Sequence, residues 1–198
     1  MEGVLFPEIW IAVAEKMRLP ALLRTTRDEP DYDVLMRYRM DILRERGITL
    51  KDIQDVIATL KPLDGADEFM RYLRERYQVL ILSDTFYQFA MPLVSQIGYP
   101  LIFCHALHTD SAGLISGYTL RQPDAKREVV DAFRERLKMR VIAMGDSYND
   151  TAMLLAADQG VLFCPPQNVI NEFPQFPVAL NYDDAKRLFQ AAAARFAV

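Results

Sequence analysis

The stretch of the sequence with the most side chains that could do chemistry is MGDSYND, residues 144–150. It continues the apolar run RVIAM, which is typical of a buried strand. Asp146, Asn149 and Asp150 would leave the end of that strand together. Carboxylates crowded at one place repel one another unless a cation lies among them, and hard oxygen ligands of this kind suit Mg²⁺. The alternative is a solvated turn, because Asp, Ser and Asn also cap helices well.

A second polar group, LSDT at residues 82–85, also follows an apolar run. We expect Ser83 to end a buried strand and Asp84 and Thr85 to open a helix, where backbone N–H groups and a hydroxyl would bind a phosphate. Ordinary helix capping is the alternative. Lys126 stands at the start of a further predicted helix and could neutralise both a phosphate and a carboxylate, although an isolated lysine is more often solvated surface.

The elements that must position these side chains follow from three apolar runs that do not alternate with polar residues. Such runs are typical of strands buried on both faces, in a parallel sheet covered by helices. Helical patterns lie between them, which predicts an α/β doubly wound fold with a mostly parallel, Rossmann-like sheet. Ligands of such folds bind at the carboxyl ends of the strands, where both polar groups fall. The predicted strands cover residues 78–82, 140–144 and 160–164, and the predicted helices 65–76, 86–97, 124–138 and 148–157.

Residues 8–60 differ from this pattern because they are predicted to be helical throughout. Gly47 is expected to cap the second of three helices. We therefore predict an α/β core of residues 1–7 and 61–198, interrupted by a small helical cap of residues 8–60. Residues 105–120 contain two polar, strand-like pieces that suggest a hairpin. The three predicted cap helices cover roughly 7–17, 31–46 and 50–59.

Composition excludes some classes of function. The chain has 198 residues, of which 51% are hydrophobic, and a net charge of −4, which argues against nucleic acid as a partner. No apolar run has the length of a membrane span or a signal peptide.

Cys104 and Cys164 lie in apolar surroundings, so we expect reduced core thiols in a cytoplasmic protein. His105 and His108 have no third metal ligand nearby and are expected to bind none. The oligomeric state stays open, with a homodimer as one alternative.

Together, Ser83 at one strand end, Lys126 before the next strand and GDSxND beyond it form the pattern of the haloacid dehalogenase superfamily. The sequence resembles that superfamily over essentially its whole length. The superfamily opens on a strand followed by Asp-x-Asp-Gly-Val/Thr, and EGV at residues 2–4 matches the second half of this motif, with Glu2 as the second acid. The nucleophilic aspartate would stand one position before Met1.

The resemblance therefore predicts that the first central strand and the attacking aspartate are missing from this sequence. We expect the chain as written to be poorly soluble and inactive. Either an incorrectly assigned start or a true truncation would explain the missing residues, and the upstream reading frame would distinguish the two.

The helical insertion resembles the cap of phosphoserine phosphatases, in which an aromatic residue and an arginine seven positions later line the substrate pocket. Tyr32 and Arg39 match this spacing, and two helical turns place both on one face. The resemblance implies that Arg39 binds a substrate carboxylate, whereas the alternative is an arginine at the edge of an apolar stripe. Glu8 would bind the substrate ammonium, the alternative being an acid at a helix N-terminus.

Several stretches, among them EGV-PEIW, TTRD-PDYDVLM, LSDTFY and NEFPQFP, resemble the bifunctional phosphoserine phosphatase/homoserine phosphotransferase branch, which also carries Glu as the second acid. This resemblance implies an Mg²⁺ cofactor and a covalent phosphoaspartate intermediate. Glu2 would protonate the departing serine oxygen and then activate the acceptor, either water or homoserine. The implied metal ligands are the backbone carbonyl of Glu2, Asp146 and Asp150, and the implied substrate-binding residues are Glu8, Arg39, Ser83, Asp84, Lys126 and Asn149.

Two other functions stay open. The protein could be a phosphatase of the same superfamily for another small phosphorylated metabolite, or a non-catalytic protein that binds phosphate or an amino acid. A nucleotide-binding protein is disfavoured, because the sequence has no GxGxxG and no GxxxxGK[ST] motif.

Overall fold

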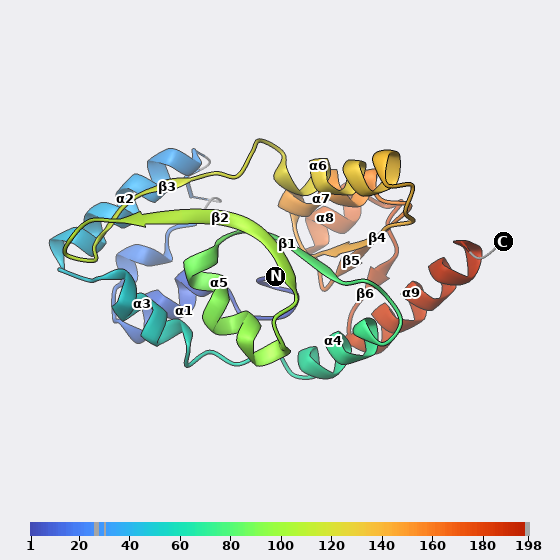
Figure 1. The fold of residues 1–198 in the computed structure, drawn as a ribbon, viewed down its shortest axis with the longest axis horizontal. Helices are drawn as coiled ribbons and strands as arrows, with labels where there is room; N and C mark the ends of the chain where they lie inside the picture. The colour runs from blue at the N-terminus through green and yellow to red at the C-terminus, as the bar shows by residue number, and fades with distance from the viewer. Residues whose placement is uncertain (26–27, 30, 197–198) are drawn as a thin grey trace.

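The structure, a computed structural model, describes residues 1–25, 28–29 and 31–196 (Figure 1). Three helices come first in the chain, and from α4 onward strands and helices alternate except at the consecutive strands β2 and β3. The helices are α1 Ile9–Lys16, α2 Tyr32–Glu45, α3 Leu50–Ile57, α4 Ala66–Arg74, α5 Tyr87–Val94, α6 Ala125–Asp131, α7 Tyr148–Ala156, α8 Gln167–Glu172 and α9 Tyr182–Phe196. The strands are β1 Leu80–Phe86, β2 Leu101–Thr109, β3 Ile115–Thr119, β4 Ile142–Gly145, β5 Gln159–Phe163 and β6 Val178–Ala179.

The strands pair mostly in parallel, which confirms the predicted α/β fold. β1 is parallel to β2, and β4, β5 and β6 are parallel in that order. β3 runs antiparallel to β2 and forms the hairpin that the sequence predicts within residues 105–120. Among the described residues the strands form two separate sheets, β1-β2-β3 and β4-β5-β6, rather than one continuous sheet. The N-terminus of the chain lies between these two halves (Figure 1).

β1 is longer than the sequence predicts. Ser83, Asp84 and Thr85 lie within the strand, and α5 begins only at Tyr87, so the prediction that Asp84 and Thr85 open a helix is wrong. Backbone pairing with β2 explains the difference, because it resumes at Phe86 after an irregularity that begins at Leu82. Long-range strand pairing has here overridden the local capping preference of Ser, Asp and Thr.

The burial of β5 explains why apolar and polar residues do not alternate in its sequence. Val161 and Phe163 belong to the larger apolar core, whereas Leu162, between them, packs with the second core beside Leu154 of α7. Successive side chains of a strand point to opposite faces, so both faces of this strand are buried. The predicted burial of the apolar runs on both faces is thereby confirmed for β5.

The three first helices gather at one end of the molecule, beside the far end of the β2–β3 hairpin (Figure 1). The Asp31 side chain caps α2 by accepting a hydrogen bond of 3.0 Å from the backbone N–H of Val34. The predicted apolar stripe of α2 is observed as four buried residues: Leu35, Met36, Arg39 and Leu43. Of the stretch TTRD-P that precedes α2, positions 26, 27 and 30 lie outside the described residues.

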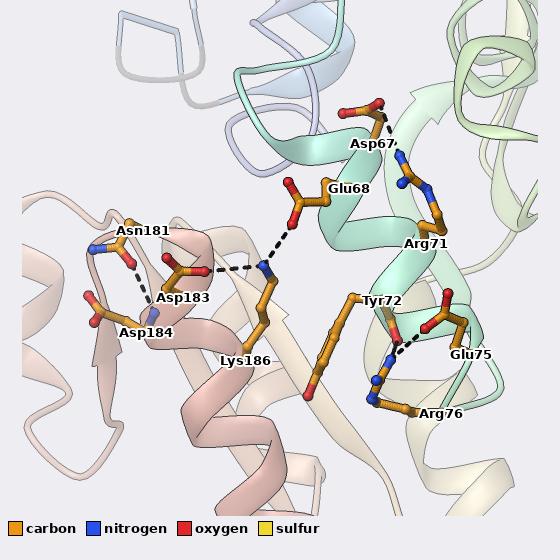
Figure 2. A network of polar contacts seen from close by, with 10 residues as sticks. All are labelled: Asp67, Glu68, Arg71, Tyr72, Glu75, Arg76, Asn181, Asp183, Asp184 and Lys186. Atoms are coloured by element: carbon orange, nitrogen blue, oxygen red, sulfur yellow. Dashed lines mark hydrogen bonds and ion pairs between the residues drawn. The ribbon is translucent and has the colours of Figure 1, made fainter.

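Helices α4 and α9 connect the two halves of the sheet. The Phe69 ring of α4 stacks on Tyr182 of α9 with ring centroids 4.9 Å apart, and the Tyr182 hydroxyl donates a 2.7 Å hydrogen bond to the Val4 carbonyl. Figure 2 shows the polar rim of this contact, where Lys186 binds Glu68 of α4 at 3.4 Å. Side-chain packing therefore holds the halves together where strand pairing does not.

We expect Phe69→Ala to lower the free energy of unfolding by about 3–5 kcal/mol, because it removes a buried ring between the two halves. Leu155→Ala is the control, since Leu155 is 56% exposed and should change stability by less than about 0.5 kcal/mol. Urea unfolding followed by circular dichroism measures both. A loss below 1 kcal/mol for Phe69→Ala would show that α4 does not carry the connection.

The two cysteines differ in burial. Cys104 is buried, as predicted, but Cys164 is exposed, so the prediction of two core thiols is wrong for Cys164. Cys164 follows the last residue of β5, where the chain turns out of the core, and its thiol donates to the Leu180 carbonyl at 3.2 Å. Within the described part of the chain, no helix has both the length and the hydropathy to cross a membrane.

Candidate active site

Lys126 is the centre of a group of charges that comes from three elements. Its Nζ lies 2.7 Å from Asp84 Oδ2 of β1 and 2.8 Å from Asp150 Oδ1 of α7, while Lys126 itself is in the first turn of α6. The Lys126 and Asp150 side chains are 12% and 11% exposed. The structure thus brings together three of the residues that the sequence predicts for the site, although they are far apart along the chain.

The charges of this group stabilise one another. Burial alone would lower the pKa of Lys126, but the charges of Asp150 and Asp84 outweigh it and raise this pKa to about 12. Burial alone would raise the pKa of Asp150, but the charges of Lys126 and the Met1 α-amino group lower it. Lys126 and Asp150 are therefore both charged at neutral pH. Lys126 has three N–H donors, so one remains for a further anion.

Two glycines allow the carboxylates to pack against the backbone. A Cβ atom on Gly145 would lie 2.4 Å from Asp150 Cβ, and one on Gly3 would lie 2.3 Å from Asp146 Oδ2. Gly3 also has a φ of 71°, which a residue with a side chain adopts only under strain. The backbone N–H of Asp146 donates to Asp150 Oδ2 at 3.0 Å. The EGV and GDSYND stretches therefore meet in space, and their glycines make this possible.

Asp146 and Asp150 are the candidate metal ligands. Burial and the charge of Asp150 raise the pKa of Asp146 to about 6. Mg²⁺ usually takes one or two carboxylates and completes its shell with water and substrate phosphate, so this pair of hard oxygen ligands fits it. In the described residues, no three His, Cys, Asp or Glu side chains are grouped so that they could hold a metal ion by themselves. A metal here would therefore depend on water and substrate for its other ligands.

Glu2 lies beside this group. Its Oε2 accepts a hydrogen bond of 2.8 Å from the backbone N–H of Ile9, and its carboxylate also accepts one from the Thr85 side chain. Burial nevertheless raises the pKa of Glu2. A carboxyl group with a raised pKa can hold a proton near neutral pH, as a general acid must. Sequence reasoning did not predict the Thr85 contact, which depends on the extension of β1.

Arg39 is a buried cation in the helical end of the molecule. It is 5% exposed, and its Nη2 donates to the Arg24 carbonyl at 2.9 Å. Burial lowers the pKa of Arg39 to about 10, although Tyr32, Glu2 and Glu8 act against this shift. Its Nε has no hydrogen-bond partner in the described residues. A buried donor without a partner costs free energy, and a ligand could supply that partner.

The other predicted site residues differ in how close they lie to the charged groups described above. Tyr32 shares a face of α2 with Arg39, as predicted, and the two interact electrostatically. Ser83 is buried in β1, where its Oγ accepts from the Thr85 N–H at 3.4 Å. Glu8 is exposed just before α1 but acts on the pKa of both Glu2 and Arg39. Asn149 is exposed in the first turn of α7, outside the contacts described above.

His105 is a further neighbour that sequence reasoning missed. Its Nδ1 accepts a hydrogen bond of 3.0 Å from the backbone N–H of Arg121, and its Nε2 lies 4.0 Å from Asp84 Oδ1. Burial lowers the pKa of His105, so the ring is neutral at pH 7, with its proton on Nε2. No sequence signal could have found this contact, because it follows from the register that pairs Phe86 with His105.

Known proteins resemble this chain in sequence and in fold. The sequence matches the haloacid dehalogenase-like hydrolases over residues 7–158. It is 60% identical over 195 residues to Phosphoserine phosphatase ThrH of Pseudomonas aeruginosa, covering 98% of this chain and 95% of that protein. It is 57% identical to Phosphoserine phosphatase of Pseudomonas syringae pv. tomato, covering 98% and 82%. The crystal structure of phosphoserine phosphatase from T. onnurineus has the same fold, with a TM-score of 0.68 at 21% identity over 93% of this chain and 88% of that one. The chain therefore belongs to the haloacid dehalogenase-like hydrolase family.

Proposed function

We propose that the protein is an Mg²⁺-dependent phosphoserine phosphatase that can also transfer the phosphoryl group to homoserine. The observation that carries this proposal is that Glu2 is within electrostatic reach of two charged sites. Lys126, Asp146 and Asp150 act on the adjacent Met1 α-amino group, and Glu2 itself acts on the pKa of Arg39. In phosphoserine the ester oxygen stands between the phosphorus and the carboxylate. A proton donor between a phosphate site and a carboxylate site matches that arrangement.

The phosphate side of the site would bind and polarise the phosphoryl group. Lys126 and Ser83 would hold its oxygens, over which charge is spread in the transition state, and Asp84 would keep Lys126 in place. Asp146 and Asp150 would hold Mg²⁺, which offsets the repulsion between the phosphate and the carboxylates. Asn149 would support this side of the site once a ligand is bound. Glu2 would protonate the leaving serine oxygen and then take a proton from the acceptor.

The helical side of the site would select the amino acid. Arg39 would bind the substrate carboxylate and Glu8 its ammonium. Serine and homoserine present the same two groups, so one pocket could accept both, with water or homoserine as the final phosphoryl acceptor. We propose the division predicted above, with residues 8–60 as cap and residues 1–7 and 61–198 as core. We also propose a cytoplasmic protein.

The attacking group is a separate question. The resemblance implies a nucleophilic aspartate two positions before Glu2, at the end of a short apolar strand. Turnover is therefore tested with an extended form, in which a short apolar strand ending in Asp is joined in front of Met1, and we expect this form to hydrolyse phosphoserine. An extended form that binds phosphoserine but does not hydrolyse it would contradict this prediction.

The proposed function is tested by phosphate release from O-phospho-L-serine with the extended form, with and without EDTA. We expect release that stops when the metal is removed and, when homoserine is added, phosphohomoserine detectable by mass spectrometry. Glycerol phosphate and other small phosphate esters serve as competing substrates. Faster release from one of these would favour a phosphatase for another metabolite. Tight phosphoserine binding without turnover by either form would favour a non-catalytic binding protein.

A further inference from the structure

Trp10, in the first turn of α1, lies against the guanidinium group of Arg39. The Arg39 Cζ is 4.5 Å from the centre of the Trp10 ring, within the range of a cation–π interaction. The tryptophan also packs against α5, because the Phe89 ring meets Trp10 edge to face with centroids 5.4 Å apart. Trp10 is therefore a packed platform under the buried arginine rather than a loose surface side chain.

The contacts that the structure describes leave one edge of the Arg39 guanidinium group available. One N–H of Nη2 donates to the Arg24 carbonyl at 2.9 Å, and among the described residues Nη1 has only the weak acceptor Sδ of Met36, at 4.0 Å. In the part of the chain that the structure describes, Nε has no partner. Nε and Nη2 form the edge that binds a carboxylate with two parallel hydrogen bonds, and Nη2 has a second N–H besides the one that Arg24 accepts. The ring of Trp10 restricts how this edge can turn.

The same turn of α1 also holds the proposed acid. The backbone N–H of Ile9 donates to Glu2 Oε2 at 2.8 Å, and Trp10 is the next residue. One turn of helix thus contacts both Glu2 and Arg39. The charge of Glu2 opposes the lowering of the Arg39 pKa by burial, so the two side chains interact electrostatically. We therefore expect the position of α1 to set the spacing between Glu2 and Arg39.

We propose that Trp10 is a positioning residue that orients the free edge of Arg39 toward a substrate carboxylate, and so sets the preference for amino acid phosphates over phosphates without a carboxylate. This inference rests on the proposed function and adds a positioning residue to the proposed substrate site. Without the indole ring, Arg39 could turn about its long side chain, and each rotamer lost on binding would weaken the complex.

The experiment uses the 198-residue chain and measures binding, so it does not depend on turnover. Two ligands are compared by calorimetry: O-phospho-L-serine and phosphoethanolamine, which has the same phosphate and ammonium but no carboxylate. Trp10→Leu should weaken phosphoserine binding roughly 3- to 30-fold and phosphoethanolamine binding less than about 2-fold. Trp10→Phe keeps a smaller aromatic face, so its affinity for phosphoserine should lie between those of the wild type and Trp10→Leu.

A matched control is available on the outer surface, where Arg76 lies 4.2 Å from the centre of the Tyr72 ring (Figure 2). Tyr72→Leu removes a similar interaction far from the site and should leave both affinities unchanged. A second measurement uses the fact that Trp10 is the single tryptophan of the chain. Its fluorescence should change when phosphoserine binds, and this change should be lost in Arg39→Met.

The outcomes separate this inference from the function on which it rests. If Trp10→Leu weakens the binding of both ligands equally, or of neither, the inference is overturned while the proposed function stands. If the wild type binds phosphoserine no more tightly than phosphoethanolamine, the proposed substrate class is wrong, and the inference fails with it. Selective weakening of phosphoserine, with Trp10→Phe intermediate, supports the positioning role.

Discussion

Replacing Lys126 with methionine is expected to lower kcat/KM of the extended form for phosphoserine by about 10²- to 10⁴-fold. The change removes the only side-chain cation that contacts both Asp84 and Asp150 in the described residues. It also leaves two carboxylates facing the phosphate without compensation. Phosphate release measures the loss. The raised pKa of Lys126, about 12, keeps it protonated from pH 5 to 9, so the wild type carries this positive charge throughout that range.

The control for this variant is Lys186→Met. Lys186 also binds two carboxylates, Glu68 at 3.4 Å and Asp183 at 3.1 Å, but on the outer surface between α4 and α9 (Figure 2). Such surface pairs contribute little, so activity should be unchanged. Lys126→Arg keeps the charge and should retain part of the activity if the variant folds, as judged by circular dichroism. A folded Lys126→Met variant with activity within threefold of the wild type would remove Lys126 from the mechanism.

The second large effect concerns Arg39. Arg39→Met should raise KM for phosphoserine about 30- to 1,000-fold, because a bidentate pair between guanidinium and carboxylate is worth about 2–4 kcal/mol when partly desolvated. The same variant should change KM for phosphoethanolamine by less than about threefold, since that compound has no carboxylate for Arg39 to bind. Steady-state kinetics of the extended form with both compounds gives the comparison.

Arg44→Met is the control on the same helix, since Arg44 is exposed in the last turn of α2. It should leave KM for both compounds unchanged. Arg39→Lys keeps the charge but loses the planar fork of donors, so its KM for phosphoserine should lie between the wild type and Arg39→Met. An equal rise in KM for both compounds would mean that Arg39 supports the cap rather than binds the carboxylate.

The sequence by itself determined the features that depend on neighbouring residues. Apolar runs without alternation placed the buried strands, and helical periodicity placed the cap helices to within a few residues. It also placed polar residues such as Asp146 at the carboxyl ends of the strands. The seven-residue spacing put Tyr32 and Arg39 on one face of a helix, because an α-helix repeats every 3.6 residues whatever surrounds it.

The tertiary structure alone decided the contacts between distant residues. The pairing of β1 with β2 kept Thr85 in a strand, where its side chain reaches Glu2, and brought His105 to Asp84. Tertiary packing placed Trp10 of α1 against Arg39 of α2. The physical reason is that strand register and helix packing minimise the free energy of the whole core, which depends on how all its side chains fit together. No pattern within a short stretch of sequence contains that information.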